Sequence, residues 1–205
     1  ASSNNWWLYA RLIQKKYLEA NTNISEGTSN GAMFDSNVGF YEGGGLDSGY
    51  QAWMWKRHAG FDVITYTGTS TTGHALPHSL GRTPEMIWAK ARSESQSWLV
   101  FHKGLNSGTT PWNWYVTLDG TGAEANWAAF VQAPTSTQFS IISNWSANSQ
   151  NYIALLFASV DGISKVGYYS GQSGNLDLDL GFAARFIVIK RTNAAGEWWV
   201  FDSLR

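Results

Sequence analysis

The sequence predicts an all-β fold made of duplicated antiparallel β-sandwich units of about 100 residues each. Three observations predict it. Short runs rich in Val, Ile, Tyr, Phe and Trp alternate with connections rich in Gly, Ser and Thr. Helical periodicity is nearly absent. One pattern of residues recurs about 100 positions further along the chain, so the 205 residues hold about two units.

The clearest strands can be taken in chain order: residues 61–68, 86–91, 97–102, 112–118, 138–143 and 151–160. Residues 6–20 could be argued as a helix, but the repeat argues that this stretch begins as a strand. Residues 176–180 alternate strictly. Asp177 and Asp179 are therefore expected to face solvent on a strand, where their charge discourages pairing with another edge.

The repeat defines the domain organisation. Residues 85–101 lie over residues 185–201 at a constant shift of 100, with Trp98 on Trp198. Residues 50–55 lie over 152–157, and Trp7 begins a stretch that resembles the strand of Trp98. The matches predict a back half of a unit over residues 1–60, a complete unit over 61–162 and a front half over 163–205.

Three arrangements of the two half units follow. They could complete one another within the molecule, or between neighbouring subunits by strand exchange, or the chain could be a segment of a longer array. The Trp-bearing strand occurs at both ends of the chain, which favours the last two arrangements. In the front half, Trp198 and Val200 should point to one side of their strand and Trp199 and Phe201 to the other. A large aromatic side chain buries about 150–250 Å², and the front half cannot bury both faces alone, so we expect a neighbour to cover these side chains.

Composition and motifs exclude several classes of function. With 14 basic and 15 acidic residues and no basic run, the chain lacks the positive field that nucleic acids or anionic membranes require. The absence of cysteine rules out disulfides and thiol chemistry. His74 and His78 flank an extended stretch through Pro77 and are expected to form hydrogen bonds rather than a metal site, although calcium in the loops of Asp47 or Asp119 stays open. We predict no catalytic residue, metal or cofactor.

The aromatic residues divide into two groups. Those matched between units are expected to form the repeat core: Tyr66, Trp98, Phe101, Tyr169, Trp198 and Phe201, with Trp7 matched to Trp98. Four other tryptophans lie near loops in regions that differ between units: Trp112, Trp114, Trp127 and Trp145. Flat rings near Asn and Asp can stack on sugars, so these four are candidates for carbohydrate stacking, while ordinary packing or subunit contact is the stronger interpretation.

The repeated motifs carry a family resemblance. Residues 63–68 (VITYTG), 78–81 (HSLG) with 84–87 (PEMI), 98–105 (WLVFHKGL) and 152–162 form the pattern, and residues 166–171 and 186–201 repeat it. This pattern resembles a β-rich repeat domain that recurs in tandem in tail-fibre and other appendage proteins of bacteriophages, cyanophages among them. The match covers most of residues 50–205.

The resemblance implies a non-catalytic virion structural protein, a tail fibre or another appendage or decoration that takes part in host attachment. It would be assembled in the host cytoplasm and carried on the extracellular particle. The expected partners are other copies of the chain or neighbouring virion proteins, and a host surface glycan. A carbohydrate-binding, lectin-like adhesin module is the alternative, and a depolymerase-type enzyme is the least favoured of the three.

Overall fold

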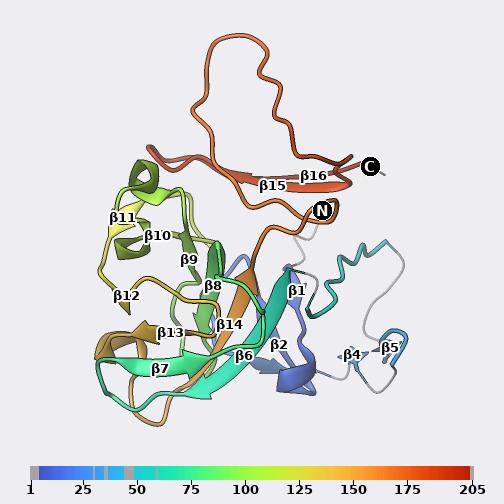
Figure 1. Ribbon diagram of the computed structural model, residues 1–205. Coiled ribbons are helices and arrows are strands. Elements are labelled where there is room, and N and C mark those ends of the chain that lie inside the picture. The colour runs from blue at the N-terminus through green and yellow to red at the C-terminus, as the bar shows by residue number, and fades with distance from the viewer. Residues whose placement is uncertain (1–4, 30, 35–36, 44–48, 59, 204–205) are drawn as a thin grey trace.

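The computed structural model describes residues 5–29, 31–34, 37–43, 49–58 and 60–203 (Figure 1). Throughout this part of the chain the regular elements are β-strands and short 3-10 helices. The predicted all-β class is therefore confirmed. The stretch at residues 6–20 forms no long helix, because it contains a short strand, one 3-10 turn and a second strand.

A six-stranded antiparallel sheet forms the centre of the molecule. Its order is β11-β10-β9-β8-β14-β6. The bounds are β6 (Phe61–Thr67), β8 (Met86–Ala91), β9 (Leu99–His102), β10 (Trp114–Thr117), β11 (Ala125–Asn126) and β14 (Asn151–Phe157). The strands predicted in this region all form, with ends trimmed by up to three residues. The central strand β14 is bonded on both edges, to β6 and to β8.

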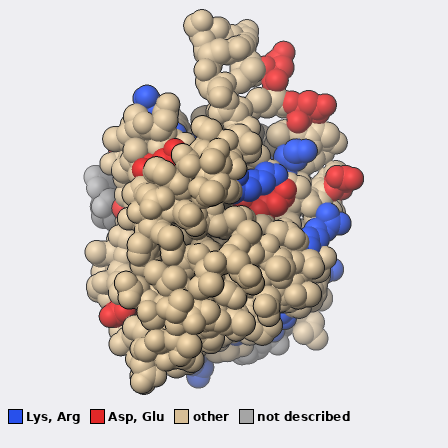
Figure 2. Space-filling model, turned by 60° about the vertical axis from the view of Figure 1, so that its left-hand side comes forward, with Lys and Arg blue, Asp and Glu red and all other residues tan. Residues whose placement is uncertain are grey.

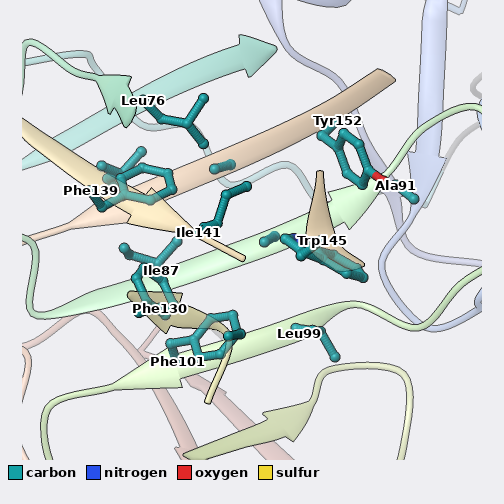
Figure 3. Packing of buried hydrophobic residues seen from close by; sticks show 14 of the residues in the cluster. Leu76, Ile87, Ala91, Leu99, Phe101, Phe130, Phe139, Ile141, Trp145 and Tyr152 are labelled. Carbon is teal, nitrogen blue, oxygen red and sulfur yellow. The ribbon is translucent and has the colours of Figure 1, made fainter. Parts of the chain in front are cut away.

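One face of this sheet is covered by a three-stranded sheet. Its order is β12-β13-β7, with β7 (His74–Pro77), β12 (Phe130–Gln132) and β13 (Gln138–Ile141). Alternate residues of the large sheet, such as Ile87 and Phe101, meet Phe130, Phe139 and Ile141 of the small one (Figure 3). This is the arrangement of a β-sandwich, in which each strand contributes every second side chain to the core.

The opposite face of the large sheet is also buried. It is covered by the N-terminal sheet β1 (Trp7–Leu8), β2 (Lys16–Glu19) and β3 (Gly27–Thr28), together with η1 (Arg11–Ile13). Ile13 and Leu18 pack there against Trp98, Ile153 and Leu155. Because β14 is buried on both faces, its sequence reads as a nearly continuous apolar run, NYIALLF. A separate hairpin, β4 (Ala32–Met33) and β5 (Tyr41–Glu42), follows the N-terminal sheet.

The C-terminal segment ends in the hairpin β15 (Phe186–Lys190) and β16 (Trp198–Asp202). In Figure 1 it lies at the top of the molecule, away from β4 and β5. The remaining elements are the 3-10 turns η2 (Leu105–Gly108), η3 (Pro111–Asn113) and η4 (Ser143–Trp145). Trp198 packs in a small core with Val100, Leu105 and Val116 on the second face of the large sheet.

Three expected strands do not form. Residues 166–171 resemble β6, residues 176–180 alternate like a strand, and residues 50–55 resemble β14, yet all three are irregular. In the middle unit, edge strands form because a partner strand is present: among the described strands, β6 is bonded only to β14 and β7 only to β13. Residues 166–171 and 176–180 are bonded to no described strand, and residues 50–55 contact β15 and β16 through side chains only, so the pattern that forms a strand in residues 61–162 does not form one here. Asp177 and Asp179 are exposed as expected, but on an irregular segment.

Candidate functional site

The most distinctive contacts join residues 61–162, the middle unit, to the segments before and after it. Trp98, at the entry to β9, donates its indole Nε1–H to the carbonyl oxygen of Glu19 in β2 at 2.8 Å. Trp198, at the start of β16, donates its indole Nε1–H to the carbonyl oxygen of Thr117 in β10 at 2.9 Å. We call the contacts between the segment before residue 61 and the hairpin β8–β9 the N-junction. We call the contacts between the hairpin β15–β16 and the middle unit the C-junction.

The two acceptor strands hold the same place in their sheets. The register of β2 with β3 pairs Tyr17 with Gly27, and that of β10 with β11 pairs Tyr115 with Ala125, a shift of 98 for both partners. The strands that pair with β10 and β2, which are β9 and β1, are also preceded by equivalent main-chain hydrogen bonds. The main-chain N–H of Trp98 is bound by a side-chain oxygen of Asp119 at 2.9 Å, and that of Trp6 by Asn21 at 2.9 Å.

The two donor hairpins share one register. Ile87 pairs with Phe101 in β8–β9, and Ile187 with Phe201 in β15–β16. Each of the other pairs in β8–β9 also has its counterpart in β15–β16 at a shift of 100. The hairpins at the two junctions therefore share the same strand register, and so do the strands β2 and β10 that they contact.

A main-chain bond closes each junction at the loops. The N–H of Glu26 donates to the carbonyl oxygen of Arg92 at 2.8 Å, and the N–H of Glu124 donates to the carbonyl oxygen of Thr192 at 2.7 Å. At the N-junction the Arg92 guanidinium also pairs with the Glu26 carboxylate at 2.8 Å. At the C-junction the N–H of Gly196 donates to Thr121 at 2.9 Å.

A lysine at matched positions organises each hairpin loop. Lys90 is fully buried and donates from Nζ to the carbonyl oxygens of Ala91 and Glu94. Burial lowers the pKa of Lys90 to about 8, against the attraction of Asp119 and Glu94. Lys190 donates to Arg191 and Gly196 of its own loop, and also to Thr121 and Gly122 across the C-junction. Its pKa is likewise lowered by burial.

The structure separates the six residues expected in the repeat core. Trp98 and Phe101 are fully buried. Tyr66 is half-buried and stacks on Tyr152 at 4.9 Å, and burial raises its pKa well above the usual range. Trp198 is half-buried at the C-junction, whereas Tyr169 and Phe201 are exposed. The three residues expected in the core are thus buried or half-buried in the middle unit, whereas two of their three counterparts in the C-terminal segment are exposed.

Trp7 was expected in the core and is 38% exposed. The registers explain the error. Trp7 pairs with Glu19 as Leu99 pairs with Thr117, so Trp7 takes the place of Leu99 and Trp6 that of Trp98. The alignment by sequence was one residue out of register, and a slip of one residue moves a side chain to the other face of a strand.

The four tryptophans proposed for carbohydrate stacking do not form one surface. Trp145 is only 5% exposed and packs edge-on to Trp127 at 5.9 Å. Trp127 in turn contacts Tyr115, and Trp114 packs in the small core beside Trp198. Trp112 differs from the other three because it lines an open hollow as well as packing on Phe130.

The hollow beside Trp112 has a volume of about 380 Å³. Its polar lining comes from Arg82, Thr83, Glu85, Lys103 and Ser159. Glu85 forms an ion pair with Lys103 and accepts a hydrogen bond from the main chain of Ser159. Burial alone would raise the pKa of Glu85, but these bonds hold it below its usual range. A flat ring beside fixed donors and acceptors is chemically suited to a polar ligand.

A second hollow of about 230 Å³ lies between residues 52–55 and the C-terminal hairpin. Trp53 packs on Phe186 at 5.2 Å and donates its indole N–H to Asp202 at 2.9 Å. Gln51 donates to the same carboxylate at 2.9 Å. Residues 50–55 therefore contact β15–β16 through side chains rather than as a bonded strand.

The described ranges hold neither a cluster of metal-ligating side chains nor a helix that could cross a membrane. They contain no group of three or more His, Cys, Asp or Glu side chains placed to hold a metal ion. His74 instead lies 2.8 Å from the Ser146 hydroxyl, and His78 lies 3.2 Å from the carbonyl oxygen of Thr135. No helix in these ranges is long and apolar enough to cross a membrane. The loop of Asp47 lies outside the described residues. On the face shown in Figure 2, acidic and basic side chains are interspersed.

The fold and the junctions define an all-β protein whose most specific contacts join similar β-hairpins to similar strands. The chain belongs to the family DUF7483, a domain of unknown function, whose model matches residues 14–205. No curated protein and no solved structure matches the chain.

Proposed function

We propose that this chain is a non-catalytic structural protein that builds an extended appendage from repeated β-sandwich units. The observation that carries the proposal is the pair of junctions, in which Trp98 bonds to Glu19 and Trp198 bonds to Thr117 in the same geometry. A contact that uses a different patch on each of the two partners can be repeated from unit to unit, and it then generates a ring or a filament. The middle unit carries both patches, the donor Trp98 and the acceptor Thr117.

The setting that we propose is a phage virion, in a tail fibre or another appendage or decoration assembled in the host cytoplasm. The resemblance of residues 50–205 to appendage repeats supports this setting. Immunogold labelling of purified virions with antibody against the chain tests it. Gold on an external appendage is the expected result, and virions that carry no gold on their surface would overturn the proposal.

The proposal that the chain is not an enzyme has a separate test. The two hollows contain no pair of free carboxylates, because Glu85 is bonded to Lys103 and Ser159, and Asp202 accepts from Trp53 and Gln51. Glycoside hydrolysis needs two carboxyl groups in distinct protonation states across a cleft. Purified chain should therefore release no reducing sugar from host polysaccharide, and measurable release would contradict the non-catalytic proposal.

Carbohydrate binding is the second candidate function, and the hollow beside Trp112 favours it. A glycan array should show binding that is lost in Trp112→Ala. Trp145→Ala is not a clean control because Trp145 is buried, so Trp7→Ala, an exposed ring on the N-terminal sheet, serves as the matched variant. An array without any bound glycan, or with equal binding by the Trp112 and Trp7 variants, would rule out this candidate.

A further inference from the structure

The hollow beside Trp112 lies within the middle unit, whose strands form both sheets of the sandwich. Its walls come from four separate segments: residues 82–85 before β8, Lys103 after β9, Trp112 in η3, and residues 158–159 after β14. Its volume of about 380 Å³ lies near the lower end of the range of about 300–1,000 Å³ that is typical of ligand pockets. The hollow therefore suits a small ligand or the end of a larger one.

The charged residues of the hollow are not part of the framework that the units share. At the shift of 100 that relates β8–β9 to β15–β16, none of the three keeps its side-chain type: Arg82, Glu85 and Lys103 correspond to Phe182, Arg185 and Ser203. The hairpin β15–β16 nevertheless forms with the same register as β8–β9. The strand framework does not require these charges, which points to a role for them outside the framework.

Both oxygens of the Glu85 carboxylate are already used inside the hollow. Oε1 accepts from Nζ of Lys103, and Oε2 accepts from the main-chain N–H of Ser159. Among the described residues no carboxylate pairs with Arg82. The lining therefore carries one more positive charge than negative charge, and this excess favours an anionic ligand.

The Arg82 side chain is exposed but is held by one hydrogen bond. Its Nη1 donates to the carbonyl oxygen of Ser159 at 2.9 Å. A guanidinium carries five N–H donors in a planar fork, so the donors on Nε and Nη2 remain for a ligand. A carboxylate matches such a fork with two parallel hydrogen bonds, and it supplies the single negative charge that the lining lacks. A carboxylate is thus the anionic group that suits Arg82.

Trp112 supplies the flat apolar side of the site. Its ring is half-buried and packs on Phe130 at 5.5 Å, which supports the ring at the edge of the hollow. Pro84 and Ala158, both buried, add to the apolar lining. Among the described residues that line the hollow, Trp112 is the one aromatic ring. The site is therefore built for a single stacked sugar ring rather than for a row of them.

We propose that this hollow binds a sugar unit that carries a carboxylate, a hexuronate, with its ring on Trp112 and its carboxylate on Arg82. The positive charge of Lys103 lies in the same hollow and adds to the attraction. A neutral sugar would gain the stacking but not the charge-assisted hydrogen bonds. The inference rests on carbohydrate binding, the second candidate function, and names the chemical class of the sugar.

Titration of the full chain with two matched sugars tests the inference, followed by NMR through the tryptophan indole signals. Methyl β-D-glucuronide and methyl β-D-glucoside differ in one group, a carboxylate against a hydroxymethyl. The glucuronide should shift the Trp112 indole signal and bind at least about tenfold more tightly than the glucoside, because a hydrogen bond to a charged group is stronger than one to a neutral group. This preference should shrink as the salt concentration rises.

Variants of Arg82 identify the group that recognises the carboxylate. Arg82→Ala should lower the affinity for the glucuronide to that for the glucoside. Arg82→Lys keeps the charge but loses the planar fork, so its affinity should lie between those of the wild type and Arg82→Ala. The matched control, Arg191→Ala, removes an exposed arginine from the β15–β16 loop and should bind the glucuronide like the wild type. Because Arg82 is exposed, its variants should keep the wild-type circular dichroism.

Three results would overturn the inference: no shift of the Trp112 indole with the glucuronide, equal affinity for the two sugars, or unchanged glucuronide binding by Arg82→Ala. Tighter binding of methyl glucoside 6-sulfate than of the glucuronide would likewise overturn the assignment to a carboxylate. A glycan array that shows Trp112-dependent binding of neutral glycans alone would remove this inference and leave carbohydrate binding standing. Labelling of an appendage on virions depends on neither result, so the failures are distinguishable.

Discussion

Trp98 and Trp198 lie one hundred positions apart, and each donates its indole N–H to a backbone carbonyl of a neighbouring segment, Glu19 for the first and Thr117 for the second. The two acceptors are themselves at matching register positions in β2 and β10. A single contact geometry is thus used twice along the chain. The account of this protein as a repeating building block depends on that relationship.

The first prediction concerns the two indole bonds. Trp98→Phe removes the donor to Glu19 inside a fully buried site, and it should lower the free energy of unfolding by about 2–4 kcal/mol. Trp198→Phe removes the equivalent donor at a half-buried site, where water can solvate the Thr117 carbonyl, and should cost about 1 kcal/mol. Urea unfolding measures both. Equal costs would mean that the two indoles do not differ in burial as described.

The second prediction is a rise in stability with pH that comes from Lys90. Its pKa in the folded chain is about 8, below the ordinary 10.5, because the amine is buried. Between these values the unfolded chain binds more protons than the folded one, so the free energy of unfolding should increase with pH, by up to ~1.4 kcal/mol per pH unit. Lys90→Met should show a smaller slope between pH 8 and 10, with a remainder from Lys190. An unchanged slope would show that Lys90 is solvated.

The third prediction concerns His102 at acid pH. Burial, with Lys103 nearby, lowers the His102 pKa from 6.5 to about 4, and Nδ1 accepts the main-chain N–H of Gly104 at 2.9 Å. The unfolded chain therefore takes up the proton first, and stability should fall as the pH drops from 6.5 towards 4. His102→Asn keeps an acceptor and cannot titrate. It should reduce the loss measured between pH 6.5 and 5, above the range in which Asp62 and Glu85 protonate. A loss equal to that of the wild type would assign the effect to other groups.

The fourth prediction uses a close backbone approach. A Cβ added at Gly68 would lie 1.9 Å from the carbonyl oxygen of Ala147, and the main chain on both sides is hydrogen-bonded. Gly68→Ala should therefore lower the unfolding free energy by at least ~2 kcal/mol, because backbone has to move. Gly171 has the matching place in the C-terminal segment, with no heavy atom within 4 Å of an added Cβ. Gly171→Ala should stay within about 0.5 kcal/mol of the wild type. Thermal unfolding of both variants measures the two costs. Similar costs for the two variants would contradict the described packing.

The strands of the middle unit could be predicted because their residues alternate or run apolar, and because each has a partner in the fold. Residues 86–91 form β8 over the predicted range. Residues 176–180 carry an equally regular pattern and form no strand, since no described strand lies beside them. A period of two shows that a segment is able to be a strand, while a hydrogen-bonded neighbour far away in sequence makes it one.

The candidate site was only half visible in the sequence. The donors Trp98 and Trp198 stand out as matched tryptophans, but the acceptors are backbone carbonyls, and Glu19 and Thr117 have unrelated side chains. The matching of β2 with β10 was missed because the shift is 98 there and 100 in the hairpins. Two tyrosines, Tyr17 and Tyr115, were the available signal. Burial of Trp145 depends on packing against distant strands, which a local pattern does not reveal.

Hydrogen exchange of the tryptophan indoles, followed by NMR, tests the central claim most directly. If both junctions exist as described, the Nε1–H groups of Trp98 and Trp198 exchange far more slowly than that of the exposed Trp199, with Trp98 the slowest. Exchange of Trp198 as fast as that of Trp199, or exposure of Trp98, would show that the two contacts are not equivalent and would remove the basis for a repeating unit.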